Sequence, residues 1–193
     1  MSGGLTRLAT AEELDGIVAR LAAELSVDHA EVDHPEGVLM VGVLKGSVCF
    51  LADLVRQMTV PVSVDFLAVT PYAPGTGRVR LVKDLDHDAA GRAVVVVEDI
   101  VDTGLTLGYL RGELERRRPA SLKVVTLVDR PVRRLLPVEV DYVGLEVPDL
   151  FVIGYGLDFA GRYRNLHGLW GADGFALAAE PDLHVMELYA PRS

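Results

Sequence analysis

The sequence predicts an α/β protein with a mainly parallel central sheet flanked by helices. Two features predict this class. Short apolar runs of strand length alternate along the chain with segments whose apolar residues recur at helical spacing. One of these runs, Val94–Val97, consists of valines without polar alternation, which is typical of a central strand buried on both faces. Strands that alternate with helices favour a parallel sheet with helices on its two faces.

Composition limits the class of protein further. The chain has 193 residues, and we expect residues 1–193 to form a single domain with a sizeable core. Hydrophobic residues make up 50% of the chain and charged residues 24%, as in a soluble globular protein. The formal net charge of -9 argues against nucleic-acid binding by the chain as a whole, because proteins that bind nucleic acid usually carry a basic surface.

Cysteine content and hydropathy indicate where the protein works. The single cysteine, Cys49, cannot form an internal disulfide, so a reduced, cytoplasmic setting is the simplest inference. The N-terminal residues lack the apolar centre of a signal peptide, and the chain has no apolar run of about 18 residues. We therefore expect neither secretion nor a membrane span.

The first predicted helix covers residues 11–25. Thr10 and Glu13 have the spacing of a capping box, in which each side chain accepts a hydrogen bond from the backbone of the other residue. The apolar residues that follow recur at helical spacing and are Leu14, Ile17, Val18, Leu21, Ala22 and Leu25. This helix has a structural role on any interpretation.

A strand over residues 38–43, a short turn and a helix over residues 48–58 are predicted next. The turn contains Lys45 and Gly46, so it combines a positive side chain with backbone N–H donors. That combination is suited to a diphosphate. A solvated loop lysine explains the same residues, and the pattern alone leaves both interpretations open.

A further strand over residues 62–69 leads into residues 70–86. Proline, glycine and threonine are frequent in this second segment. We therefore expect a mobile loop there rather than a core element.

The central stretch, residues 92–107, reads RAVVVVEDIVDTGLTL. The valine strand ends in Glu98, Asp99 and Asp102, and a turn of small residues then opens a helix. Ligands of α/β proteins bind beyond the carboxyl ends of the strands, and N–H groups at a helix N-terminus attract phosphate. Ribose hydroxyls or a magnesium ion would explain acids beside a phosphate. The alternative is an ordinary strand-loop-helix connection with solvated acids.

The remaining elements follow in order. A helix over residues 107–117 ends in the basic run Arg116–Arg118, for which a solvated helix end is favoured over a nucleic-acid patch. Strands are predicted over residues 122–128 and 140–147, and Arg130 follows the first of them. We expect a last strand over residues 183–190, which read LHVMELYA.

Several segments together resemble the type I phosphoribosyltransferases, in the form found in the hypoxanthine-guanine phosphoribosyltransferases. Residues 94–107 resemble the motif that binds phosphoribosyl pyrophosphate (PRPP), and residues 44–56, LKGSVCFLADLVR, resemble the pyrophosphate loop and its helix. Residues 148–166, PDLFVIGYGLDFAGRYRNL, resemble the segment that binds the base. Residues 70–86 stand at the position of the family's flexible lid.

The resemblance implies the type I phosphoribosyltransferase fold, with a small hood subdomain built from the chain ends. It implies transfer of the phosphoribosyl group from PRPP to hypoxanthine or guanine, with Mg²⁺ as cofactor and a homodimer or homotetramer as the assembly. In that family the peptide bond corresponding to Leu44-Lys45 can be cis.

The resemblance also implies a role for each site residue. Asp102 would take the proton on purine N7, and Glu98 and Asp99 would hold the ribose hydroxyls directly or through metal. The implied 5′-phosphate turn comprises Asp102, Thr103, Gly104, Leu105 and Thr106. The pyrophosphate residues would be Lys45, Gly46 and Arg164, and the base residues Arg130, Phe151 and Val152. Asp158 would hold a second magnesium ion, and Tyr72 would be the lid residue.

This sequence departs from the family's pattern at two places. Pro71 stands before Tyr72 where the family usually has serine, and the lid is shortened around residues 75–77. Arg130 replaces a lysine that contacts the purine's exocyclic oxygen, and arginine differs from lysine in shape and reach. Two alternatives therefore stay open: a phosphoribosyltransferase for another heterocyclic base, and a non-catalytic regulator that senses PRPP.

Overall fold

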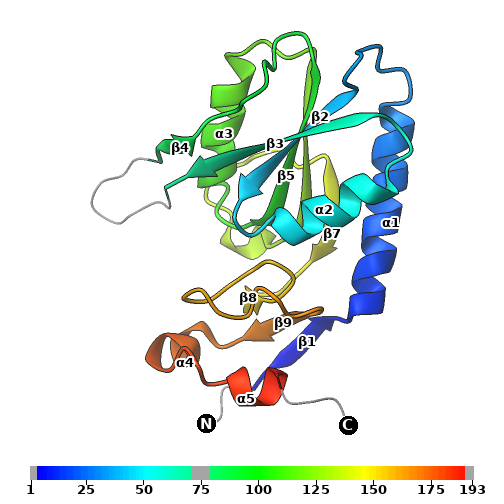
Figure 1. The fold of residues 1–193 in the computed structure, drawn as a ribbon. Helices are drawn as coiled ribbons and strands as arrows, with labels where there is room; N and C mark the ends of the chain where they lie inside the picture. Colours follow the sequence, from blue (N-terminus) through cyan, green and yellow to red (C-terminus); the bar gives the residue numbers. More distant parts are fainter. Residues whose placement is uncertain (1–3, 71–78, 190–193) are drawn as a thin grey trace.

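A computed structural model of the chain describes residues 4–70 and 79–189. Its main sheet has the strand order β4-β3-β2-β5-β6-β7 (Figure 1). The neighbouring strands pair in parallel except for β4, which runs antiparallel to β3. The strands of this sheet are β2 (Val38–Leu44), β3 (Val62–Val69), β4 (Leu81–Lys83), β5 (Ala93–Val101), β6 (Ser121–Asp129) and β7 (Tyr142–Glu146). This topology confirms the predicted α/β class.

Helices cover both faces of the main sheet. Alternate residues of the buried strands point to opposite faces, so the valines of β5 divide between two cores. Val95 and Val97 pack with α1 (Ala11–Asp28) and α2 (Val48–Gln57), whereas Val94 and Val96 pack with α3 (Leu105–Glu115). A strand of valines without polar alternation is therefore buried on both faces, as predicted.

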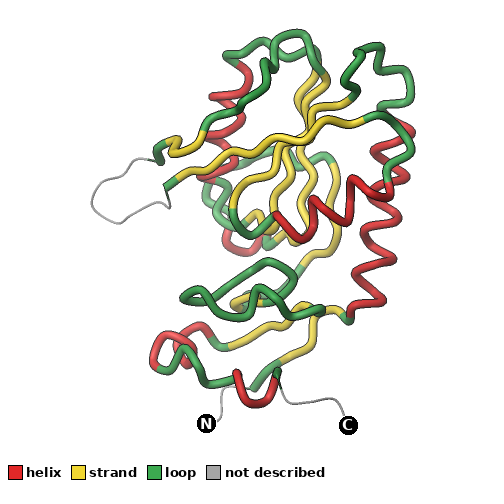
Figure 2. The backbone as a smooth tube through the Cα atoms, viewed as in Figure 1, coloured by secondary structure: helices red, strands yellow, loops and turns green. Residues whose placement is uncertain are grey.

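A second, three-stranded sheet joins the two ends of the chain. It has the order β1-β9-β8 and is antiparallel, with β1 (Thr6–Ala9), β8 (Phe151–Ile153) and β9 (Leu169–Ala172). It lies beside one end of the main sheet with its own small core, and the short helices α4 (Gly174–Ala179) and α5 (Val185–Leu188) complete it (Figure 2). We call this unit, residues 4–9 and 151–189, the hood.

Three predictions about secondary structure need correction. Residues 185–188 form helix α5 rather than part of a strand, since no neighbouring strand of the described chain pairs with them. Residues 81–83, expected in a loop, form strand β4 on the edge of the sheet. The predicted helix over residues 107–117 begins two residues earlier, at Leu105, and ends at Glu115.

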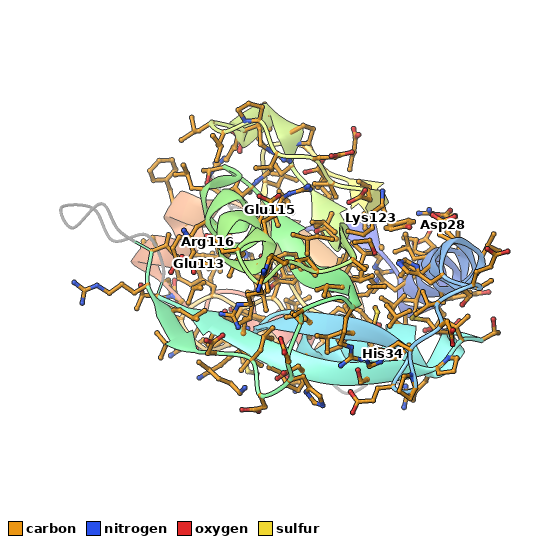
Figure 3. All side chains as sticks on the ribbon, turned by 90° about the horizontal axis from the view of Figure 1, so that it is seen from above. Asp28, His34, Glu113, Glu115, Arg116 and Lys123 are labelled. Carbon is orange, nitrogen blue, oxygen red and sulfur yellow. The ribbon has the colours of Figure 1, made fainter. Side chains whose placement is uncertain are left out.

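The predicted start of the first helix is confirmed. Helix α1 begins with the predicted capping box: Glu13 N donates to Thr10 Oγ1 over 3.1 Å, and Thr10 N donates to Glu13 Oε2 over 2.8 Å. In the basic run, Arg116 pairs with Glu113 on α3 (Figure 3), and Arg117 pairs with Asp84 over 2.6 Å. These contacts are those of a solvated helix end. No helix within residues 4–70 and 79–189 is long and apolar enough to cross a membrane.

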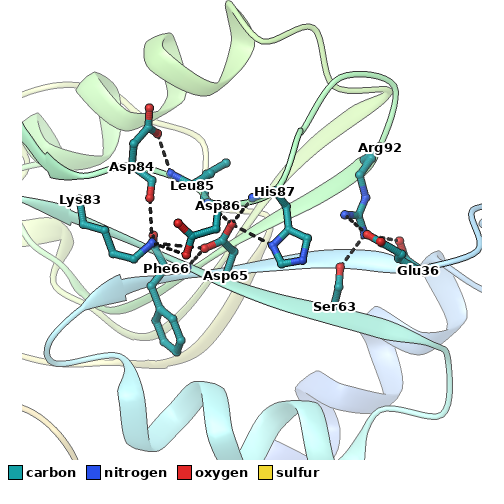
Figure 4. Close-up of polar contacts among 11 residues, drawn as sticks. Glu36, Ser63, Asp65, Phe66, Lys83, Asp84, Leu85, Asp86, His87 and Arg92 are labelled. Atoms are coloured by element: carbon teal, nitrogen blue, oxygen red, sulfur yellow. Dashed lines mark hydrogen bonds and ion pairs between the residues drawn. The ribbon is translucent and has the colours of Figure 1, made fainter.

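A buried carboxylate on β3 anchors the segment that follows β4 (Figure 4). Asp65 is 3% exposed and accepts hydrogen bonds from the N–H groups of Phe66, Asp86 and His87 over 2.7, 2.7 and 2.8 Å. Burial raises the pKa of Asp65, but the backbone hydrogen bonds from His87 and Phe66 outweigh it and hold this pKa below the ordinary value of 3.8. The ionised form of Asp65 therefore stabilises the fold.

We expect Asp65→Asn to lower the free energy of unfolding by about 2–3 kcal/mol at pH 7, because an amide nitrogen would face backbone donors. A carboxyl whose folded-state pKa is lowered stabilises the fold above its unfolded value, and loses this contribution as the pH falls through the folded value. The difference between the two proteins in urea unfolding should therefore shrink below pH 4. The exposed Asp33→Asn change removes the same charge and serves as control. An equal effect of the two changes at pH 7 would contradict this account.

Candidate active site

The carboxyl ends of β2 and β5 lie side by side, because these strands are neighbouring and parallel. Each strand is followed by a turn and then by a helix, α2 after β2 and α3 after β5. The turn that contains Lys45 and Gly46, which we call the lysine turn, therefore opens at the same edge of the sheet as the turn over residues 102–106, which we call the phosphate turn. β6 ends at this edge as well, beside β5, and Arg130 follows it directly.

A cavity of about 280 Å³ lies at the end of β5. Glu98, Ile100, Val101, Asp102, Thr103, Gly104, Thr106 and Leu107 line it. Most of the residues predicted for the ribose and the 5′-phosphate thus surround one space. Leu105 is absent from this lining and instead begins α3, where its N–H faces Thr103 Oγ1 over 3.4 Å.

The start of α3 is suited to an anion. Gly104 has a φ of 82°, a left-handed conformation that L side chains rarely adopt, and a Cβ there would lie 2.5 Å from the carbonyl oxygen of Leu136. Within the part of the chain that the structure describes, no side chain caps this helix. Thr103, Gly104 and Thr106, at the start of this helix, line the cavity, and the helix dipole favours negative charge there.

The segment after β6 holds the phosphate turn in place. The carbonyl oxygen of Thr103 accepts hydrogen bonds from the N–H groups of Leu135 and Leu136 over 2.9 and 3.0 Å. Nothing in the sequence pattern of residues 131–138 indicated this contact, because the partners are backbone groups. The segment is thus part of the site's framework although it was not predicted to be.

A second group of site residues gathers around the lysine turn. A Cβ at Gly46 would lie 1.5 Å from Asp99 Oδ2, and a Cβ at Gly156 would lie 2.1 Å from the carbonyl oxygen of Gly46. Arg164 donates from Nη1 to the carbonyl oxygen of Gly156 over 2.7 Å, and its Nη2 lies 2.6 Å from Asp158 Oδ1. The side chain of Lys45 is exposed, and the Leu44-Lys45 peptide bond is cis.

The structure therefore brings the predicted pyrophosphate residues and two predicted metal ligands together. Gly46, Asp99, Asp158 and Arg164 are linked by direct contacts, partly through Gly156. Gly156 was not singled out from the sequence. The two closely spaced glycines Gly154 and Gly156 are the sequence signal that could have identified it, and in the structure Gly156 has a φ of 101°.

The two adjacent acids of β5 face different parts of the site. Alternation along the strand directs Glu98 to the cavity beside the phosphate turn and Asp99 to Gly46. Burial raises the pKa of Glu98 well above its ordinary value, and the neighbouring charge of Asp99 raises it further. Burial also raises the pKa of Asp99 to about 6, against the lowering effect of its hydrogen bond from Ile100 and of Arg164.

Poorly solvated acids favour the binding of a cation or of hydroxyl donors, Glu98 at the cavity and Asp99 beside Gly46. Their oxygen atoms are the ligands that Mg²⁺ prefers. No group of three or more His, Cys, Asp or Glu side chains among residues 4–70 and 79–189 is arranged to hold a metal ion by itself. The residues present therefore fit a magnesium ion that takes its remaining ligands from phosphate and water, which is the usual manner for this ion.

Asp102 is held by Arg130. The guanidinium donates from Nε to Asp102 Oδ1 over 3.1 Å and from Nη2 to Oδ2 over 2.6 Å, while Nη1 donates to the carbonyl oxygen of Leu150. The backbone N–H of Arg130 also donates to the carbonyl oxygen of Val101 over 3.0 Å. The two predicted residues thus lie together at the ends of neighbouring strands.

The other two predicted base residues, Phe151 and Val152, lie on β8, in the hood. Phe151 is half-buried, and its ring meets that of Phe159 edge to face with centroids 5.2 Å apart. Val152 is 4% exposed and pairs with Gly171 of β9. Phe151 thus already packs against Phe159 in the protein, and the stacking of its ring on a base stays a prediction. Tyr72 and Pro71 lie outside the described residues.

Comparison with known proteins shows which proteins the chain resembles. Residues 5–160 match the family described as phosphoribosyl transferase domain. A hypoxanthine phosphoribosyltransferase from Haemophilus influenzae is 45% identical over 152 residues, which are 77% of this chain and 84% of that protein. A hypoxanthine-guanine phosphoribosyltransferase from Mycobacterium tuberculosis is 45% identical over 164 residues, 82% of this chain and 81% of that protein.

A solved structure agrees with these relatives. The crystal structure of a hypoxanthine-guanine phosphoribosyltransferase from Bacillus anthracis, with a HEPES molecule in its active site, has a TM-score of 0.81 to this chain at 37% identity. The match covers 88% of this chain and 99% of that chain.

Proposed function

The chain belongs to the phosphoribosyltransferase family, and on that premise we propose how its residues perform the transfer. The protein is a purine phosphoribosyltransferase that transfers the 5-phosphoribosyl group of PRPP to hypoxanthine, guanine or both. The products are IMP or GMP and pyrophosphate, which makes the reaction a step of purine salvage. The observation that carries the assignment of residues is the meeting of the lysine turn and the phosphate turn at one edge of the sheet.

In the proposed reaction a purine nitrogen attacks C1 of the ribose. The new carbon–nitrogen bond forms as the bond from C1 to the pyrophosphate oxygen breaks, with inversion at C1. Positive charge develops on the ribose ring and negative charge on the leaving diphosphate. The protein accelerates the step by stabilising both charges in a fixed geometry.

The phosphate turn binds the 5′-phosphate in this proposal. The N–H groups of Thr103, Gly104, Leu105 and Thr106 donate to the phosphate oxygens, aided by the dipole of α3. Glu98 lines the same cavity and accepts hydrogen bonds from the ribose hydroxyls. The turn thus fixes the ribose at one end while the opposite side of the site holds the leaving group.

The pyrophosphate is held between the lysine turn and Arg164. Lys45 supplies an exposed cation, Gly46 supplies a backbone donor and Arg164 supplies a planar fork suited to phosphate oxygens. Arg164 is already oriented by Gly156, whose backbone adjoins Gly46. These residues neutralise the charge that grows on the leaving group.

Asp102 acts on the base. Its carboxylate accepts the proton that purine N7 carries, so that electron density is available at the attacking nitrogen. Phe151 stacks on the purine ring, and the backbone of Val152 hydrogen-bonds its edge. Arg130 lies beside Asp102 and has N–H groups left for the exocyclic oxygen of the base.

Glu98 and Asp99 would hold a magnesium ion and Asp158 a second one, in agreement with their oxygen donors and with the raised pKa values of the first two. When bound, magnesium would supply positive charge beside the diphosphate and the ribose hydroxyls. Asp158 is paired with Arg164 in this structure, so a metal ion or the diphosphate competes for that contact.

The remaining properties are proposals as well. We propose that residues 1–193 form one domain that assembles into a homodimer or homotetramer in the cytoplasm. The shared sheet of the chain ends, β1 with β9, supports the single domain.

Pyrophosphate release from PRPP with a panel of bases tests the function. We expect the kcat/KM values for hypoxanthine and guanine to exceed those for adenine, orotate and uracil by at least about 100-fold. Adenine lacks the keto group to which Arg130 would donate, and the pyrimidines orotate and uracil lack the N7 on which Asp102 would act. Turnover should require Mg²⁺. A preference for a base that is not a 6-oxopurine would contradict the assignment, and absence of release with every base would indicate a PRPP-binding regulator.

A further inference from the structure

Arg130 makes more hydrogen bonds than recognition of the base requires. Its side chain is 5% exposed, and each of its three nitrogen atoms donates a hydrogen bond within the protein. Two of these bonds go to separate oxygens of Asp102, in the bidentate arrangement that a planar guanidinium forms with a carboxylate. The third goes to Leu150, the residue that precedes Phe151. Arg130 therefore connects the end of β5 with the start of β8.

The neighbouring ion pairs explain why Arg130 is available to Asp102. Arg134 pairs with Asp129, and Arg133 pairs with the exposed Asp149. Asp129, which adjoins Arg130 in sequence, thus already has a partner. The carboxylate that Arg130 does bind is the one that lines the cavity.

The bidentate contact with Arg130 leaves the Asp102 carboxylate able to accept a further hydrogen bond. Each carboxylate oxygen has two acceptor sites, so an oxygen that accepts from Arg130 can accept one further hydrogen bond. Asp102 has a 32% exposed side chain, in contrast to the buried Arg130. The guanidinium thus restricts the rotation of the carboxylate without occupying all of its acceptors.

We propose that Arg130 is a positioning residue that fixes the Asp102 carboxylate and ties it to the strand that carries Phe151. This inference rests on the proposed function, because it assigns Asp102 to the purine proton. Lysine has one nitrogen atom, so it cannot bind both oxygens of Asp102 through a rigid fork and also reach Leu150. It can still donate to the carbonyl oxygen of a base. The Arg130→Lys change therefore separates positioning of Asp102 from recognition of the base.

Steady-state kinetics of Arg130→Lys with PRPP and hypoxanthine test this proposal. We expect kcat to fall by about 10- to 100-fold, because misplacement of a reacting group by about 1 Å has effects of this size. The KM for hypoxanthine should change by less than about threefold, since the donor to the base is retained. The control is Arg133→Lys, which alters an exposed ion pair of the same segment. An unchanged kcat with a raised KM would overturn the proposal.

A double-mutant cycle with Asp102→Asn adds a stricter requirement. If Arg130 acts through Asp102, Arg130→Lys should lower kcat by less than about threefold in the Asp102→Asn protein. Independent, multiplicative effects of the two changes would contradict a positioning role. Thermal unfolding midpoints of all variants must agree, so that loss of folded protein is not taken for loss of turnover.

A measurement without turnover separates this inference from the proposed function. In protein labelled with ¹⁵N-arginine, the Nε–H of Arg130 should exchange slowly with water in the wild-type protein and faster in Asp102→Ala, which removes both acceptor oxygens. An exchange rate that does not respond to Asp102→Ala would overturn the contact itself. If the wild-type protein showed no activity on any base but slow exchange of the Arg130 Nε–H, the proposed function would be refuted. The contact between Arg130 and Asp102, which we call the Arg130 clamp, would still stand.

Discussion

Asp102→Asn should lower kcat for hypoxanthine by about 100- to 10,000-fold, the usual range for loss of a general base. An amide cannot accept the proton of purine N7. The amide also places an NH₂ group against Arg130, which in the wild-type protein donates to both carboxylate oxygens of Asp102. The KM for PRPP should change by less than about threefold, because the N–H groups of the phosphate turn are unaltered.

Asp149→Asn is the matched control for this change. Asp149 also pairs with an arginine, but both side chains of that pair are about half exposed. Exposed ion pairs contribute little to stability, so the variant should stay folded. Because Asp149 has no role in the proposed reaction, turnover should stay within about twofold of the wild-type value. Wild-type turnover in Asp102→Asn would remove Asp102 from the mechanism.

Gly46→Ala should raise the KM for PRPP by at least about 100-fold, because it displaces groups that must fit the diphosphate to within a fraction of an ångström. The added Cβ would lie 1.5 Å from Oδ2 and 2.5 Å from Cγ of Asp99. Asp99 would have to leave its present position, in which Oδ1 accepts from the N–H of Ile100 over 2.9 Å. A metal ligand and the pyrophosphate loop are thus disturbed together.

Gly112→Ala serves as control for the second prediction. Gly112 lies within α3, and a Cβ there would have nothing within 4 Å. Alanine is the better helix former by about 1 kcal/mol, so the protein should become slightly more stable with unchanged kinetics. Isothermal titration with PRPP and Mg²⁺ measures both variants. Equal PRPP affinity of Gly46→Ala and the wild-type protein would contradict the role assigned to the lysine turn.

The sequence was sufficient for the parallel strands of the main sheet because these strands carry strong local signals, whereas the short antiparallel β4 was missed. The valines of β5 predict burial on both faces, and the capping box at Thr10 predicts where α1 begins. The hood was predicted less well. Its final helix α5 was expected as a strand, because a four-residue helix is too short to show a helical period.

The site residues on strand ends were predictable for the same reason. Acids, a lysine and glycines directly after apolar runs mark the edge of a parallel sheet where ligands bind. The contacts between segments distant in sequence were not predictable. The Arg130 clamp on Asp102, the backbone hydrogen bonds from Leu135 and Leu136, and the approach of Gly156 to Gly46 depend on tertiary packing.

A crystal structure with PRPP, Mg²⁺ and a purine analogue that has carbon in place of the attacking nitrogen tests the central claim most directly. The account predicts the 5′-phosphate on the N–H groups of Thr103–Thr106, the pyrophosphate between Lys45 and Arg164, and the purine ring between Phe151 and the Asp102 carboxylate. A 5′-phosphate bound away from this turn, or a purine ring out of reach of Asp102, would contradict it.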